Sequence, residues 1–287
     1  MTNNLIINFS EEKEFQEVKE KVAIFFNKKV NEFEELVPSL YGIGKNTYKN
    51  HIVSKIDNKI VGIFAIKEKS ISNEYGFLKV LIVGSICVDP NYRKMGIMTK
   101  MFEFLFDFYD SKVDAYILSG DYSRYVHYGF HPGEDLEKYI INNKIKSSNL
   151  SFVHLNYEDI EYVKNLQNSE EFKVVRQKDI METLSMWKDV PFIIKENNKK
   201  IGLIVFDGRN NIIDEIYLTN KQDINLVLSS FASLFENEIY LKITPFNNYY
   251  NNLIDPNFQK TLHKERTLYR IMNREIKKLF IPRNDLI

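Results

Sequence analysis

LIVGSICVDPNYRKMGIMTKMFEFLFDF (residues 81–108) is the most informative stretch of the sequence. It opens within a long apolar run, Leu78 to Val88, which is typical of a strand that is buried on both faces. Asp89-Pro90 ends that strand. Apolar residues then recur at helical spacing, so a helix is predicted to begin near Ile97.

The loop that joins this strand to this helix, Arg93 to Met98, has the features of an anion site. The first turn of a helix leaves about four N–H groups unpaired and carries roughly half a positive charge. Gly96 lets the backbone approach a ligand closely, while Arg93 and Lys94 add positive charge. The same residues also fit an ordinary strand–turn–helix connection, so the loop alone does not decide the function.

Composition sets the broad class. The chain has 287 residues, 44% of them hydrophobic and 27% charged, which is typical of a globular protein with one large domain or two of ordinary size. Lys plus Arg and Asp plus Glu both number 39, so the basic excess of a nucleic-acid binder is missing. One cysteine, no signal-like N-terminus and no apolar run near ~20 residues favour a cytoplasmic protein that does not enter a membrane. The frequent Asn, Lys and Ile residues favour a bacterial source.

Further elements are predicted on both sides of the central stretch. A strand over Ala115 to Ser119 leads into SGDYSRYVHYGF (residues 119–130), which combines aromatic rings, an Arg, a His and two glycines in a way that a core does not need. Upstream we expect helices over residues 11–27 and 31–36 and a hairpin over residues 51–56 and 60–67.

The second half of the chain resembles a weakened copy of the first. VSKIDNKIVGIFAI from Val53 and IIKENNKKIGLIVF from Ile193 share a Lys, an Asn-Lys turn and a Gly at an offset of about 140 residues. The polar stretch KIKSSNLS from Lys144 is a plausible linker, so we predict domains over residues 1–145 and 150–287. No glycine follows Gly208, and the second domain is therefore expected to lack a loop like that at Gly96.

The order of these features resembles the GNAT superfamily of acyl-coenzyme A N-acyltransferases. The resemblance rests on Arg93-x-x-Gly96-x-Met98 after the buried strand and on Tyr125-Val-His-Tyr-Gly129-Phe130 after the next strand. The family loop ends in Gly or Ala where this chain has Met98. The resemblance covers about residues 52–133 and implies an α/β (α+β) GNAT fold, with a central mixed, mostly antiparallel sheet flanked by helices and a second, degenerate GNAT-like α/β domain.

The resemblance also implies a cofactor site for acetyl-coenzyme A. The strand end is expected to splay from its neighbour and to bind the pantetheine arm through its main chain, with one N–H polarising the thioester carbonyl. The loop amides are expected to hold the pyrophosphate. The implied cofactor-binding residues are Ile86, Cys87, Val88, Arg93, Lys94, Met95, Gly96, Ile97, Met98 and Thr99. Cys87 as a covalent nucleophile is the sharper alternative, but a lone Cys in a buried strand is usually a small hydrophobe.

Tyr125 is the implied catalytic residue. In the family, a Tyr four residues before the Gly of Gly-Phe lies beside the thioester sulfur, and a phenol with a pKa near 10 can protonate the departing thiolate. Aromatic packing is the alternative, which we prefer for Tyr122 and Tyr128.

The sequence says less about the general base, a metal site and the acceptor. Candidates for the base that deprotonates the amine are Glu34, Glu35, His51, Asp121 and His127, each better explained as a surface or structural residue. The five histidines are scattered, so no metal site is predicted. The resemblance implies direct acetyl transfer to a primary amine of a small molecule or a protein. The alternatives are a coenzyme A-binding sensor without transferase activity and a purely structural protein. Nothing in the sequence selects the amine or an oligomeric state.

Overall fold

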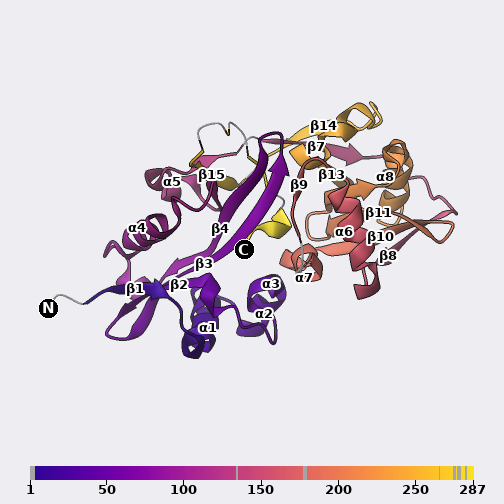
Figure 1. Cartoon of the computed structure of the whole chain (residues 1–287). Coiled ribbons are helices and arrows are strands. Elements are labelled where there is room, and N and C mark those ends of the chain that lie inside the picture. Colours follow the sequence, from indigo (N-terminus) through magenta and orange to yellow (C-terminus); the bar gives the residue numbers. More distant parts are fainter. Residues whose placement is uncertain are drawn as a thin grey trace.

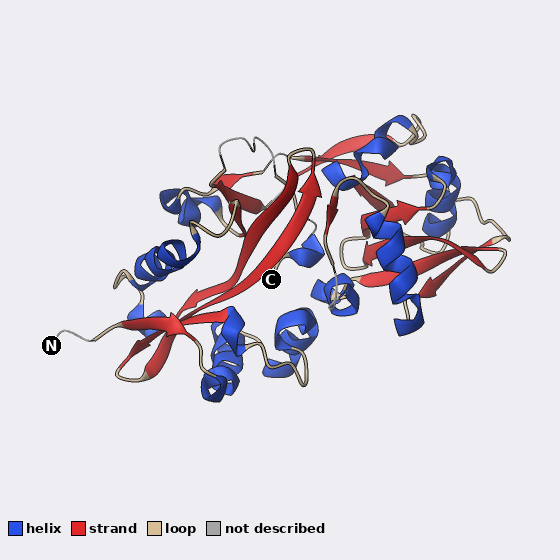
Figure 2. Ribbon diagram, in the orientation of Figure 1, coloured by secondary structure: helices blue, strands red, loops and turns tan. Residues whose placement is uncertain are grey.

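The computed structural model describes residues 4–133, 135–176, 180–264, 266–273, 276, 279–281 and 283–287. Two mixed sheets lie side by side, each flanked by helices (Figures 1 and 2). The predicted α/β class is confirmed. None of the helices in the described ranges is long and apolar enough to cross a membrane.

The first sheet has the strand order β1-β2-β3-β4-β5-β15-β6, with β9 paired to β3. Among its described strand pairs only β4 and β5 run parallel, so the sheet is mixed and mostly antiparallel, as predicted. Its strands are β1 (Ile6–Phe9), β2 (His51–Ile56), β3 (Lys59–Asn73), β4 (Gly76–Val88), β5 (Ala115–Ser119), β6 (His131–Pro132), β9 (Lys173–Val174) and β15 (Thr267–Ile271).

Alternating side chains of this sheet enter two cores. On β4, Val80 and Ile82 pack with α1 (Phe15–Phe25), α2 (Val30–Leu36) and α3 (Pro38–Tyr41), while Leu81 and Val83 pack with α4 (Ile97–Tyr109) and α5 (Tyr122–Tyr125). Figure 1 shows the two groups of helices on opposite faces. The strand predicted to be buried on both faces is therefore confirmed, and the helix begins at Ile97 as expected.

Strand β3, predicted over residues 60–67, is longer than expected and forms a second hairpin with β4. Pairing continues from Ala65 opposite Gly84 out to Asn73 opposite Gly76, so β3 extends past Lys67. The outer part of β3 has a more polar composition than the part in the core, because it is covered on one side only, and the sequence pattern fades there.

The second sheet has the strand order β14-β7-β13-β12-β11-β10-β8 and one parallel pair, β12 with β13. Its strands are β7 (Leu136–Ile141), β8 (Leu150–His154), β10 (Val190–Glu196), β11 (Lys199–Asp207), β12 (Ile212–Leu218), β13 (Ile239–Ile243) and β14 (Gln259–His263). The helices of this half are α6 (Ile160–Asn168), α7 (Ile180–Leu184) and α8 (Ile224–Ala232).

The two halves share the register of their hairpins. Gly62 lies opposite Ser54 and Gly202 opposite Ile194, and in both hairpins the register shifts at the next residue of the first strand. The turn residues Asp57 and Asn58 and their counterparts Asn197 and Asn198 all have positive φ, between 46° and 67°. Each half then continues strand, helix, parallel strand. The second half is thus GNAT-like in order and register, as the repeat predicted.

Three strands cross the division predicted at residues 145–150. β7 precedes it in sequence but pairs with β13 and β14 of the second sheet. β15 and β9 follow it but pair with β5, β6 and β3 of the first. Sheet membership therefore departs from the predicted segments at these strands, and the division into 1–145 and 150–287 stays a prediction.

Candidate active site

The end of β4 separates from β5. The two strands pair at Val80–Ala115, Leu81–Tyr116 and Ile82–Ile117. β5 pairs with β15 on its other side along its whole length, Ala115–Ser119, while beyond Ile82 the described pairing of β4 is with β3 alone, up to Val88. This parting leaves one edge of the β4 backbone, including Ile86, Cys87 and Val88, facing the gap between the strands. A strand edge of this kind offers N–H and C=O groups to a ligand.

A β-bulge redirects β4 at the same place. Ile63 lies opposite Cys87 and Ala65 opposite Gly84, so Ser85 and Ile86 together face Phe64. Ser85 has φ 48°, a left-handed conformation that a serine adopts only when its surroundings hold it there. Tyr41, buried at the end of α3, donates a hydrogen bond from its hydroxyl to Ser85 Oγ at 2.9 Å. We infer that this bond helps to fix the bulge.

Cys87 is a packed thiol. Its Sγ lies 3.7 Å from the carbonyl oxygen of Ile63, and burial raises the pKa of the thiol well above its usual value. A thiol with a raised pKa is a poor nucleophile at neutral pH. These features favour the reading in which Cys87 contributes only its main chain.

The loop after β4 has the geometry of an anion cradle. The N–H of Asp89 donates to the Val61 carbonyl at 2.8 Å, and Arg93 Nε donates to the Val88 carbonyl at 3.2 Å, so the loop is tied to the strand end. Lys94 and Gly96 both have left-handed backbones, with φ 65° and 71°. Alternating left-handed residues turn successive N–H groups toward one concave side.

The first turn of α4 continues this cradle. The first intrahelical bond runs from the N–H of Lys100 to the carbonyl of Gly96 at 3.1 Å, so the preceding amides have no partner within the helix. A side chain at Gly96 would meet no heavy atom within 4 Å, and only its φ demands glycine. Met95 points outward and is 49% exposed.

The family departure at Met98 is accommodated by the core. Met98 is partly buried and packs against the α4 face of the sheet, together with Ile97. The Met98 side chain thus packs into this core. Thr99 is exposed, and its Oγ1 lies 3.0 Å from the hydroxyl of Tyr128.

Tyr125 lies at the end of the short helix that follows β5. Asp121 caps this helix by accepting a hydrogen bond from the Ser123 N–H at 3.0 Å. The Tyr125 ring lies against Gly120, where an added Cβ would come within 2.7 Å of Cε2. The residue is only 7% exposed, and burial raises the pKa of the phenol.

The Tyr125 hydroxyl is free for a ligand. Within the described part of the chain no group hydrogen-bonds it, although Cys87 of β4 is close enough to add to the rise in its pKa. Tyr128, by contrast, stacks on Phe102 at a centroid distance of 4.3 Å. Tyr122 is 41% exposed. The structure therefore brings Tyr125, Cys87 and the β4 bulge together, and leaves the other two tyrosines in packing or surface roles.

Four of the five candidate bases are engaged in other contacts or buried, and the fifth, His127, is exposed. Glu34 pairs with Lys19 at 2.8 Å and Glu35 with Lys188 at 3.1 Å. Asp121 caps α5, and His127 is exposed. His51 is fully buried between Phe15 and Tyr41, its Nδ1 is 3.0 Å from the Thr47 carbonyl, and burial lowers its pKa to about 4.

The sequence did not predict one contact at the site, that of the Ile287 main chain with β4. An ideal Cβ on Gly84 would lie 1.6 Å from the carbonyl oxygen of Ile287, so the main chain of Ile287 lies directly on β4 beside the bulge. Figure 1 shows the C label next to this hairpin. A glycine inside a strand often marks a close approach of another backbone, and this signal was available at Gly84.

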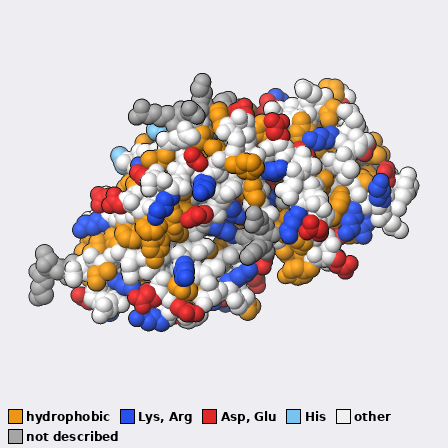
Figure 3. Space-filling view, in the orientation of Figure 1, with side chains coloured by type: hydrophobic (Ala, Val, Ile, Leu, Met, Phe, Trp, Pro, Cys, Tyr) orange, Lys and Arg blue, Asp and Glu red, His pale blue; other side chains and the backbone are white. Residues whose placement is uncertain are grey.

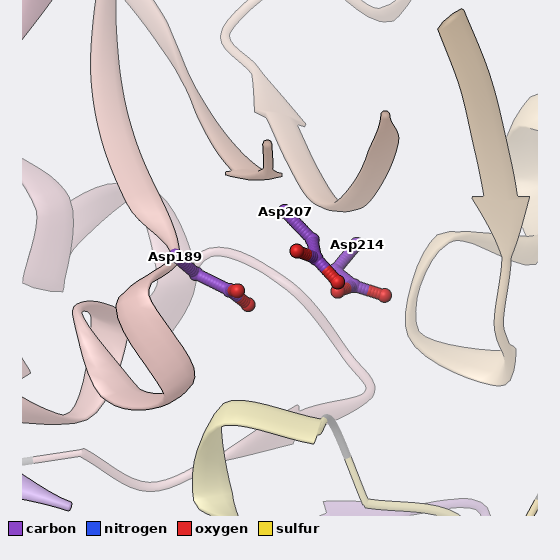
Figure 4. Close-up of side chains that lie close together, drawn as sticks. All are labelled: Asp189, Asp207 and Asp214. Atoms are coloured by element: carbon purple, nitrogen blue, oxygen red, sulfur yellow. The ribbon is translucent and has the colours of Figure 1, made fainter. Parts of the chain in front are cut away.

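Three aspartates of the second sheet lie close together (Figure 4). Asp189, Asp207 and Asp214 are buried, and one carboxylate oxygen of each lies within 4.8 Å of the others. Arg283 Nη1 stands among them, 3.5 Å from Asp189 Oδ1 and 3.3 Å from Asp214 Oδ2, and it also pairs with Asp207. Arg209 also pairs with Asp207 and Asp189, and Lys242 pairs with Asp214, so three cationic side chains supply positive charge around the three carboxylates.

The surface gives no preference for a charged partner on the face shown in Figure 3. Acidic and basic side chains are interspersed there, in agreement with the equal numbers in the sequence. A nucleic-acid-binding surface would gather cations instead.

Residues 7–133 match the family model described as acetyltransferase (GNAT) domain. Solved structures resemble nearly the whole chain at low sequence identity. A conserved protein of unknown function from Enterococcus faecalis V583, described as a probable N-acyltransferase, is 15% identical, with a TM-score of 0.70 over 94% of this chain and 73% of its own.

Two further structures support the same fold. A GCN5-related N-acetyltransferase from Anabaena variabilis ATCC 29413 is 14% identical, with a TM-score of 0.71 over 94% of this chain and 73% of its own. Eis1 from Mycobacterium abscessus is 13% identical, with a TM-score of 0.60 over 94% of this chain and 74% of its own. Among proteins of curated function, none matches the sequence.

Proposed function

We propose that the protein transfers an acetyl group from acetyl-coenzyme A to a primary amine, because residues 7–133 match the GNAT acetyltransferase family model. The acceptor is a small molecule or a protein amino group, and attack is direct, in a ternary complex. The single observation that carries the proposal is the continuity of the bulged end of β4, whose edge toward β5 is open, with the left-handed loop that opens α4.

The residues present fit the cofactor. In this proposal the amides of residues 94–99 bind the pyrophosphate and Arg93 and Lys94 add positive charge, which is supported by the left-handed backbone of Lys94 and Gly96 and by the open space at Gly96. The free edge of Ile86, Cys87 and Val88 suits the amide groups of the pantetheine arm. When bound, acetyl-coenzyme A supplies an activated thioester.

The chain's own groups then divide the chemistry. A main-chain N–H at the end of β4 polarises the acetyl carbonyl, as in an oxyanion hole. The amine nitrogen forms the new C–N bond as the C–S bond breaks, and the Tyr125 phenol gives its proton to the leaving sulfur. Since burial raises the pKa of Tyr125, the phenol is protonated at neutral pH and ready to donate. Water carries the proton that the amine loses to the Tyr125 phenolate, which restores the phenol for the next turnover.

Two measurements test this proposal. Acetyl-coenzyme A should raise the Tm of the protein, because a ligand that binds only the folded state stabilises it. A panel of amines, screened by release of free thiol, should then contain at least one acceptor. A protein whose Tm is unaffected by millimolar acetyl-coenzyme A would contradict the proposal.

A second candidate function is a coenzyme A-binding sensor that transfers nothing. The observation that favours it is the engagement of Glu34, Glu35 and Asp121 in other contacts and the burial of His51, so that of the five candidate bases His127 alone is exposed and without such a contact among the described residues. Stabilisation by coenzyme A together with no thiol release across the whole amine panel would favour this function over catalysis.

A further inference from the structure

We propose that buried charged side chains from both sheets form an electrostatic clamp that holds residues 283–287 against β4 of the first sheet, so that Arg283 and Asp285 are positioning residues for the acceptor. The inference rests on the proposed function. It concerns the acceptor because Ile287 lies on the α1–α3 face of β4, opposite the α4 face whose helix opens with the anion loop. We define residues 283–287 as the terminal segment and Arg283, Asp285 and their partners as the clamp.

One half of the clamp surrounds Asp285. Arg176 Nε donates to Asp285 Oδ2 at 3.1 Å, and Lys69 Nζ lies 3.0 Å from Asp285 Oδ1. The other two nitrogens of Arg176 donate to the two carboxylate oxygens of Glu215, each at 2.8 Å. The Glu215 carboxylate also accepts a hydrogen bond from the hydroxyl of Tyr217. The side chains of Lys69, Arg176, Glu215 and Asp285 are at most 5% exposed.

The other half surrounds Arg283, two residues earlier. Its guanidinium pairs with three aspartates. Asp189 directly precedes β10, Asp207 is the last residue of β11, and Asp214 lies on β12; Figure 4 shows these three side chains. Arg283 thus attaches the terminal segment to three neighbouring strands of the second sheet. Beyond Asp285, Leu286 and Ile287 are buried in the core that contains Tyr41 and α3.

The clamp occupies the counterpart of the active-site bulge. The equivalent glycines Gly62 and Gly202 lie opposite Val88 and Leu218, so these two residues are equivalent positions of β4 and β12. Counted back along the two strands from there, Gly84 corresponds to Asp214, and Ser85 corresponds to Glu215. In the second sheet β12 also has a register shift here and also parts from β13, after Ile213. The position at which β4 is bulged in the first sheet therefore carries carboxylates in the second: Asp214 pairs with Arg283 directly, and Glu215 pairs with Arg176, which in turn pairs with Asp285.

Energetics favour a positioning role for these ion pairs. Removing charges from water costs about as much as their mutual attraction returns, so buried pairs contribute little net stability. Their geometry is nevertheless strict, because a buried charge without its partner is strongly unfavourable. A segment held by such pairs at residues 283 and 285 has little freedom to shift at residue 287. The clamp therefore sets the position of the Ile287 main chain on Gly84.

The test compares variants of the full chain. Asp285→Asn keeps the shape but removes the charge that faces Arg176 and Lys69. Arg283→Gln removes a charge from the other half, and Arg283→Lys retains it. Lys260→Gln is the matched control, because Lys260 pairs with Glu137 of the same sheet on the surface, with its side chain 50% exposed. The readouts are kcat/KM for an amine that the wild type accepts and the Kd of coenzyme A.

We expect Asp285→Asn to lower kcat/KM for the amine about 10- to 100-fold, since small misplacements at a reacting centre have effects of this order. The Kd of coenzyme A should stay within about twofold, because its cradle lies on the α4 side. Arg283→Gln should behave similarly, Arg283→Lys should recover most of the loss, and Lys260→Gln should match the wild type. An Asp285→Asn protein with wild-type kcat/KM, or with equal losses for amine and coenzyme A, would overturn the inference.

Amide hydrogen exchange separates this inference from the proposed function. In Asp285→Asn, the amides of Gly84 and Ser85 should exchange faster, because the Ile287 main chain that lies on Gly84 is held less firmly. If the wild type transfers to no amine, the proposed function fails while this readout still decides the inference, and unchanged protection at Gly84 and Ser85 overturns it. If Asp285→Asn does not fold, the Arg283→Gln and Arg283→Lys pair provides the same comparison.

Discussion

Replacing Gly84 by alanine should disturb the cleft through a single atom. The added Cβ would lie 1.6 Å from the Ile287 carbonyl oxygen and 2.3 Å from its carbon, whereas ordinary contacts begin near 3.4 Å. The Ile287 main chain must therefore move by about 1.8 Å, the difference between 1.6 and 3.4 Å. The clamp at residues 283 and 285 resists this movement, so part of the strain remains in the folded protein.

The expected cost follows from overpacking. Extra volume in a packed core typically costs about 1–3 kcal/mol, which corresponds to a Tm lower by roughly 2–12 °C in a protein of this size class. The amine kcat/KM should fall as well, by about tenfold or more, while the Kd of coenzyme A changes little. Thermal denaturation and steady-state kinetics measure both effects.

Gly208→Ala is the matched control for this substitution. Its added Cβ would meet only ring atoms of Phe206, at 3.7 Å and 4.0 Å, which is ordinary contact. We expect Gly208→Ala to keep the Tm and kcat/KM of the wild type. If Gly84→Ala proved as stable and as active as Gly208→Ala, the placement of Ile287 on β4 would be wrong.

Three other substitutions probe the site and the clamp. Tyr125→Phe should lower kcat about 100-fold or more with the Kd of coenzyme A retained, and wild-type turnover from pH 6 to 9 would show that the phenol is not the acid. Gly96→Ala should weaken coenzyme A binding measured by calorimetry, because φ 71° strains any residue with a Cβ; an unchanged Kd would argue against the cradle. Burial, against the opposing effect of Arg283, raises the pKa of Asp189 to about 8, so its ionisation is a cost that grows as pH rises from about 4 to 8. Asp189→Asn should therefore raise the Tm relative to wild type more at pH 8 than at pH 5, and an equal difference at both pH values would contradict this assignment.

The sequence predicted the parts of the fold that depend on local pattern. The run from Leu78 to Val88, the stop at Asp89-Pro90 and the helix from Ile97 follow from hydrophobic period and backbone preference, and all three are present. Strand exchange by β7 and β15 could not be predicted in this way, because the choice of a pairing partner depends on residues far apart in the chain.

For the candidate site, too, the sequence predicted only the features that depend on local pattern. Gly96 indicated the left-handed loop, but the left-handed Lys94 has no sequence signal, because lysine normally avoids that conformation. The Tyr41–Ser85 hydrogen bond joins residues 44 positions apart, and Arg176–Asp285 joins residues 109 apart. Contacts of this kind arise from tertiary packing, which hydrophobic period does not encode.

The most direct test of the account is a crystal structure of the complex with coenzyme A. We predict pyrophosphate oxygens within about 2.7–3.2 Å of main-chain nitrogens in residues 94–99, and the thiol facing the Tyr125 hydroxyl from the gap between β4 and β5. A pyrophosphate bound away from that loop, or a thiol on the far side of the sheet from Tyr125, would contradict it.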